Sequence, residues 1–123
     1  MPRHSTVKTV EAESEINKII GMYEISENDD VEKIRDFIEN HNHLIPILKE
    51  AKEHITSVFG DCVKIFLELY YDIEEGWEQL FVVIKSPYDS DKALELKLRL
   101  IREWLIHTVS EAREYLAISE EPL

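Results

Sequence analysis

The sequence predicts an α+β fold in two layers, with an antiparallel β-hairpin packed against a long C-terminal helix and shorter N-terminal helices. Apolar residues recur at helical spacing before Gly60 and after Pro87, whereas the period changes from 3.6 to 2 between them. A chain of 123 residues can bury enough apolar surface for one core without disulfides or metals. We therefore expect a single domain over residues 1–123, with residues 1–10 poorly ordered.

Three helices are expected before Gly60. The first lies in VEAESEINKIIGMYEI and the second in SENDDVEKIRDFIEN, where Asp29 precedes Glu32 at the spacing of an N-cap and its reciprocal partner. The third begins near Asn42, accepts Pro46 in its first turn and stops at the glycine. Their apolar faces are Ile16, Ile19, Ile20 and Tyr23; Val31, Ile34 and Ile38; and Leu44, Ile47, Leu48, Ala51, Ile55 and Val58.

The hairpin lies in CVKIFLELYYDIEEGWEQLFVVIKSP. A two-residue loop at Glu75 and Gly76 would pair Tyr71 with Leu80, so that the apolar sets of both strands share one face. That face on the first strand consists of Val63, Ile65, Leu67, Leu69, Tyr71 and Ile73.

The final helix is expected to begin at a cap on Ser90 or Asp91 and to run through residue 116. Its length would be roughly 38 Å, enough to lie along the whole hairpin. The stripe expected to face the core is Leu94, Leu98, Ile101, Leu105, Val109, Ala112 and Leu116. The segment 116–119 is also a candidate for a third strand.

The second face of the hairpin is apolar too, which is unusual for a water-facing surface. With the expected register, Tyr70 lies directly across from Phe81. A contiguous apolar patch of this kind is typical of a contact surface, covered by the N-terminal segment or by another chain. The partner-binding residues that we predict are Phe66, Tyr70, Trp77, Phe81 and Val83.

Composition narrows the class of partner. Asp and Glu number 26 against 14 Lys and Arg, for a net charge of -12. This charge argues against direct nucleic-acid binding and favours a basic protein partner. No apolar run is long enough to span a membrane, and the single cysteine fits a reducing compartment, so the cytoplasm is the expected location.

The sequence contains no convincing pattern of catalytic or metal-binding residues. Glu68 and Asp72 share a face but lie roughly 13 Å apart along the strand, too far to share one ion. Surface or capping roles are expected for His41 and His43, and a buried or half-buried position for Cys62. No catalytic residue, metal ligand or cofactor is predicted.

The order of a helix ending in VFG, a strand pair, SPYD and a long helix containing REWL resembles a group of small uncharacterised prokaryotic α+β proteins. The resemblance covers about residues 31–119 and implies the order of the segments, without an activity, catalytic residues or a cofactor.

From these observations we expect a non-enzymatic protein–protein interaction module that forms a homo-oligomer, with an acidic antitoxin-like or adaptor protein as one version. The alternative is a metal-assisted hydrolase that uses Asp72 and Glu74 near the hairpin turn, together with a histidine that the fold brings to them.

Overall fold

The computed structural model describes residues 14–108 and 114–123. A helical segment over residues 14–22 precedes the named elements. These are α2 (Val31–Asn40), α3 (Leu44–Phe59), β1 (Lys64–Asp72), β2 (Trp77–Ser86), α4 (Ser90–Glu103), the short 3-10 helix η1 (Leu105–His107) and β3 (Leu116–Pro122). Residues 1–10, which we expected to be poorly ordered, lie outside the described residues.

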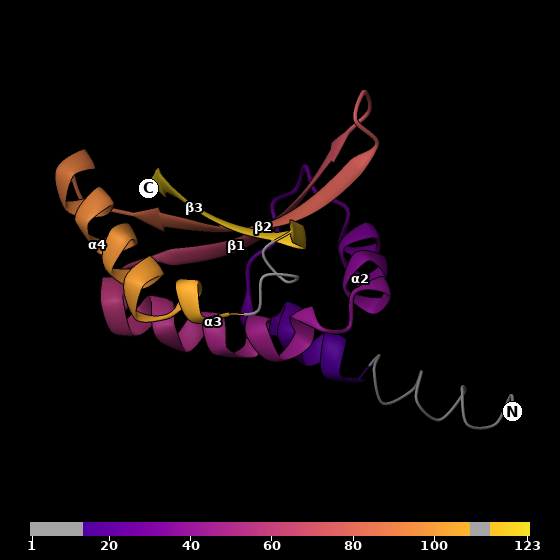
Figure 1. Cartoon of the computed structure of the whole chain (residues 1–123), viewed down its shortest axis with the longest axis horizontal. Coiled ribbons are helices and arrows are strands. Elements are labelled where there is room, and N and C mark those ends of the chain that lie inside the picture. The colour runs from indigo at the N-terminus through magenta and orange to yellow at the C-terminus, as the bar shows by residue number, and fades with distance from the viewer. Residues whose placement is uncertain (1–13, 109–113) are drawn as a thin grey trace, which may run out of the picture.

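The sheet confirms the predicted α+β class and the third strand. Strand β2 lies in the centre, antiparallel to β1 and parallel to β3. Because parallel neighbours need a crossover, the chain between β2 and β3 passes through α4. Figure 1 shows α3 and α4 on one side of the sheet, with β3 along the central strand.

The outer edge of β1 is also partly paired. The Glu24 amide donates to the Ile65 carbonyl over 2.9 Å, and the Leu67 amide donates to the Glu24 carbonyl over 3.0 Å. This short parallel bridge holds the segment before α2 against the sheet.

The predicted register of the hairpin is wrong by two residues. Leu69 pairs with Leu80, not Val82, because the loop has four residues, 73–76, in place of two. The Asp72 carboxylate accepts from the Glu75 amide over 2.9 Å, and Gly76 adopts a left-handed φ of 71°. A shift of two preserves the alternation, so each predicted side chain stays on its predicted face.

The core lies between the helices and one sheet face. Its sheet side consists of Ile65, Leu67, Leu80, Val82, Ile84, Leu116 and Ile118. Against these pack the predicted apolar faces of the first three helices, except Val31, with Phe37 and Phe59 in addition. Tyr71 and Ile73 are exposed, so the end of the hairpin extends past the core, as Figure 1 shows.

The predicted extent and orientation of the last helix are wrong. Helix α4 ends at Glu103, and its N-cap is Asp89, whose carboxylate accepts from the Lys92 amide over 2.8 Å. The N-cap of α2 is Asp30, not Asp29. The buried face of α4 consists of Ala93, Leu96 and Leu100, followed by Trp104, whereas Leu94 and Leu98 of the predicted stripe are exposed. Val109 and Ala112 of that stripe lie outside the described residues.

Candidate functional site

The second face of the sheet carries the predicted partner-binding residues. Phe66 and Tyr70 lie on β1, and Phe81 and Val83 lie on β2. All four point away from the core, because successive side chains of a strand alternate between the two faces of the sheet. In Figure 1 no labelled helix lies over this side of β2 and β3. Within residues 14–108 and 114–123, the side chains of this face therefore reach solvent to different extents.

Side chains on this face contact one another in pairs. The rings of Tyr70 and Phe81 meet edge to face at 4.7 Å between centroids. The register places Glu68 opposite Phe81, so the aromatic contact is diagonal and not directly cross-strand as predicted. The Lys85 ammonium lies 4.6 Å from the centre of the Phe66 ring, within the range of a cation–π interaction.

The five predicted contact residues differ in exposure. Val83 is buried at 1% exposure, and Phe66 and Phe81 are half-buried. Tyr70 and Trp77 each keep 45% of their surface exposed. The two exposed rings lie nearer the hairpin loop, and the two half-buried rings lie farther along the strands from it.

The carboxyl groups of Glu68, Glu121 and Asp29 modify the electrostatics around Tyr70, and Glu68 has the largest effect. The Tyr70 hydroxyl donates to Glu68, and this hydrogen bond, with burial, raises the pKa of Tyr70 to about 12. Burial, followed by the charge of Glu68, raises the pKa of Asp29. The loop before α2 thus places the Asp29 carboxyl group beside this end of β1.

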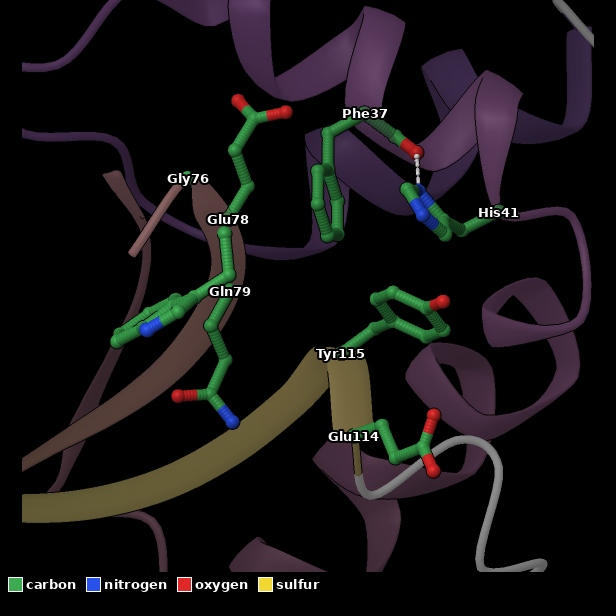
Figure 2. Close-up of a pocket in the computed structure, with 8 residues that line it drawn as sticks. Phe37, His41, Gly76, Glu78, Gln79, Glu114 and Tyr115 are labelled. Atoms are coloured by element: carbon green, nitrogen blue, oxygen red, sulfur yellow. Dashed lines mark hydrogen bonds between the residues drawn. The ribbon is translucent and has the colours of Figure 1, made fainter. Parts of the chain in front are cut away.

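A cleft lies between α2, the end of the hairpin and the start of β3. Its volume is about 570 Å³, and its lining includes Phe37, His41, Trp77, Glu78 and Tyr115. Figure 2 shows the rings of Phe37, His41 and Tyr115 gathered on one side, with Glu78 on the facing strand. The sequence did not predict this cleft, since its residues come from three distant segments.

His41 has a fixed structural role in the cleft. Its ring stacks on Phe37 at 4.2 Å and contacts Tyr115 at 4.4 Å. Because the Phe37 carbonyl, 2.8 Å from Nδ1, can only accept, Nδ1 carries the proton there. The nearby His43 Nε2 is buried and has no hydrogen-bond partner. His41 is also the C-cap residue of α2, where its backbone amide donates to the Ile38 carbonyl.

A second cavity of about 500 Å³ shares Phe37, His41 and Glu78 with the cleft. Its lining adds three carboxylates, Asp29, Asp30 and Asp36, and one cation, Lys33. The two cavities together form a surface that is aromatic at its centre and acidic around it.

The carboxylates of the hydrolase alternative lie at the end of β1 and in the hairpin loop. Asp72 accepts from the Glu75 amide, and Glu74 is exposed. Among residues 14–108 and 114–123, no group of three His, Cys, Asp or Glu side chains is arranged to hold a metal ion. The hydrolase stays a prediction, without a residue arrangement that favours it.

The prediction of a buried or half-buried Cys62 is wrong, because the residue is exposed. It sits in the turn after α3, where its sulfur lies 3.2 Å from the Tyr88 hydroxyl. That hydroxyl also donates to the Phe59 carbonyl over 2.6 Å. Tyr88 therefore contacts both the end of α3 and the turn that leads to β1. The hydrogen bond with Cys62 raises the pKa of Tyr88.

No family model, curated protein or solved structure matches the chain. Within the described residues, no helix is both long and apolar enough to cross a membrane.

Proposed function

We propose that the protein is a non-enzymatic protein–protein interaction module that self-associates and binds a partner protein through the second face of its sheet. The observation that carries the proposal is the outward position of Tyr70 and Trp77 beside the half-buried rings of Phe66 and Phe81. Aromatic side chains supply large contact areas with little loss of conformational freedom, which makes them common binding residues. Val83 would form the base of this surface.

Charge favours a basic partner. The net charge of -12 produces a field that attracts positively charged proteins and accelerates their association. The carboxylates of Asp36 and Glu78 lie at the cavities next to the hairpin, where they would strengthen this attraction. An acidic adaptor or antitoxin-like protein of the cytoplasm is a concrete version of the proposal.

The test compares two tyrosines that lie next to each other on opposite faces of β1. Tagged wild-type protein, Tyr70→Glu and Tyr71→Glu are used to capture partners from a lysate of the native host. Both substitutions add one negative charge at an exposed ring, so general charge effects are matched.

We expect the same partner to be recovered with the wild type and Tyr71→Glu and lost with Tyr70→Glu. Equal recovery by all three proteins would reject the second face as the binding surface. Light scattering on the wild type tests self-association separately, and a monomer mass at every concentration would reject it.

A further inference from the structure

Helix α4 carries two apolar stripes, and only one of them faces the core. Ala93, Leu96 and Leu100 are buried, while Leu94 and Leu98 are 57% and 47% exposed. Ile101 continues the outer stripe and is half-buried. In Figure 1 α4 lies at one end of the molecule, so nothing labelled there covers its outer side.

The outer stripe has the spacing of a helix–helix seam. Its members are separated by four residues and then by three, which places them on one line along the helix. A partner helix with the same alternation can insert its side chains between them. The chain contains this matching helix in α4 itself.

We propose that a second copy of the protein docks on this stripe, with the two α4 helices antiparallel about a two-fold axis. Such an interface is isologous, so each contact occurs twice. With the axis between Leu98 and Ile101, Leu98 of one copy packs on Ile101 of the other. Leu94 then lies toward the C-terminal end of α4 in the other copy.

Charges beside the stripe favour the antiparallel direction. Glu95 and Arg102 are exposed and lie seven residues apart, hence on the same side of the stripe. In the antiparallel pair Glu95 of one copy lies within roughly 3 Å, along the axis, of Arg102 of the other. A parallel pair would instead bring Lys97 beside Arg102 of the second copy, and like charges repel.

The ion pair of Glu95 with Lys92 on the same helix is weak. The Glu95 carboxylate lies 4.0 Å from the Lys92 ammonium, at the limit of an ion pair, and both side chains are exposed. Glu95 can therefore turn toward a cation on a second copy at little cost.

This inference rests on the proposed self-association and assigns it to α4, which leaves the second sheet face for the partner protein. A contact of about two helical turns is small, so we expect a dissociation constant in the micromolar range or weaker. Sedimentation equilibrium over a range of concentrations is the suitable measurement.

The first comparison uses wild type, Leu98→Glu and Tyr70→Glu. We expect the wild type to approach twice the monomer mass, Leu98→Glu to stay monomeric, and Tyr70→Glu to dimerise as the wild type does. Circular dichroism verifies that each variant is folded. Since both substitutions introduce a glutamate at an exposed apolar residue, the difference between them locates the interface.

The second comparison uses surface charges and leaves the apolar stripe intact. Glu95→Arg should weaken the dimer by about tenfold, because it opposes Arg102 of the second copy. Adding Arg102→Glu should restore the affinity. Glu53→Arg, at an exposed position on α3, changes the net charge equally and should have no effect.

Three outcomes would overturn the inference. Dimerisation that resists Leu98→Glu and is lost in Tyr70→Glu would place self-association on the sheet and leave the proposed function intact. Failure of Arg102→Glu to restore the Glu95→Arg variant would reject the antiparallel pair. A wild type that is monomeric throughout would reject both the α4 interface and the proposed self-association.

Discussion

The Tyr70 hydroxyl donates a hydrogen bond to the Glu68 carboxylate over 2.7 Å, between two residues on the same face of β1. Ionisation of the phenol would destroy this bond and place two negative charges together, which is why the pKa of Tyr70 rises from 10.0 to about 12. The pair makes the second face of the sheet sensitive to alkaline pH.

We expect an NMR titration of ring-labelled tyrosine to show Tyr70 ionising near pH 12 and to show a lower pKa in Glu68→Gln. Since Tyr70 of the unfolded chain ionises near pH 10, the unfolded state loses its proton first. The contribution of this pair to stability is therefore complete below pH 10 and is lost as the pH rises toward 12. Glu74→Gln, in the exposed hairpin loop, is the control and should leave the titration of Tyr70 unchanged.

The N-cap of α4 provides a second prediction. Asp89→Ala removes the acceptor of the Lys92 amide and should lower the free energy of unfolding by about 1 kcal/mol. Ser90→Ala, one residue later, should change it by less than about 0.5 kcal/mol. Urea denaturation followed by circular dichroism measures both, and equal losses would contradict the position of the cap.

Two glycines should respond in opposite directions to substitution by alanine. Gly60 has a φ of 86° and a ψ of -177°, a conformation that other residues rarely adopt, so Gly60→Ala should destabilise by about 1–3 kcal/mol. Its added methyl group would meet only an ordinary contact with Tyr88, hence the loss would come from the backbone. Gly21 is helical with open space around it, and Gly21→Ala should stabilise by about 0.5 kcal/mol. Thermal or urea denaturation distinguishes the two signs.

The two leucine environments should differ in their contribution to folding. Leu67 is fully buried between the sheet and the helices, and Leu67→Ala should lower the free energy of unfolding by about 2–5 kcal/mol. Leu94 is exposed on α4, and Leu94→Ala should change it by no more than about 0.5 kcal/mol at low protein concentration. A large loss at Leu94 in dilute solution would mean that α4 packs with its outer stripe inward.

Metal titration separates the interaction module from the hydrolase alternative. We expect millimolar magnesium or manganese to leave the thermal midpoint of the wild type unchanged, because Asp72 is used by the hairpin loop. A rise in the midpoint that disappears in Asp72→Asn would support the hydrolase.

The sequence predicted which face each hairpin residue occupies more reliably than it predicted the pairing. Alternation alone separates Leu67 and Leu69 from Phe66 and Tyr70, and this separation holds for any register shifted by an even number. The pairing depends on the length of the loop. Nothing in the sequence around Glu74 and Glu75 indicated that the Asp72 carboxylate would accept from the Glu75 amide and stabilise a four-residue loop.

The extent of α4 could not be predicted because its limit is set by the sheet. Residues 90–116 have good helical propensity, and two leucine stripes satisfy the helical period equally well. The chain must nevertheless return to the start of β2 so that Leu116 can pair with Leu80, and this return interrupts the helix after Glu103. The pairing of β3 with β2 therefore determines which stripe of α4 faces the core, and this pairing is not visible in the local sequence.

The aromatic cleft was missed for a related reason. Phe37, His41 and Tyr115 are separated by up to 78 residues in the sequence, and each has an ordinary local role. Their contact requires the parallel placement of β3, which turns Tyr115 toward the end of α2. A cavity made by the topology has no local sequence signal.

Strand β3 pairs only with β2 in the described sheet, so the backbone groups along its other edge have no partner strand there. The end of this strand contains Glu120, Glu121 and Pro122, and it combines repelling charge with a residue that lacks an amide proton. These residues would hinder the addition of a strand from another chain to the free edge of β3. The composition of this strand end therefore disfavours edge-to-edge pairing with another chain, the contact from which fibrils grow.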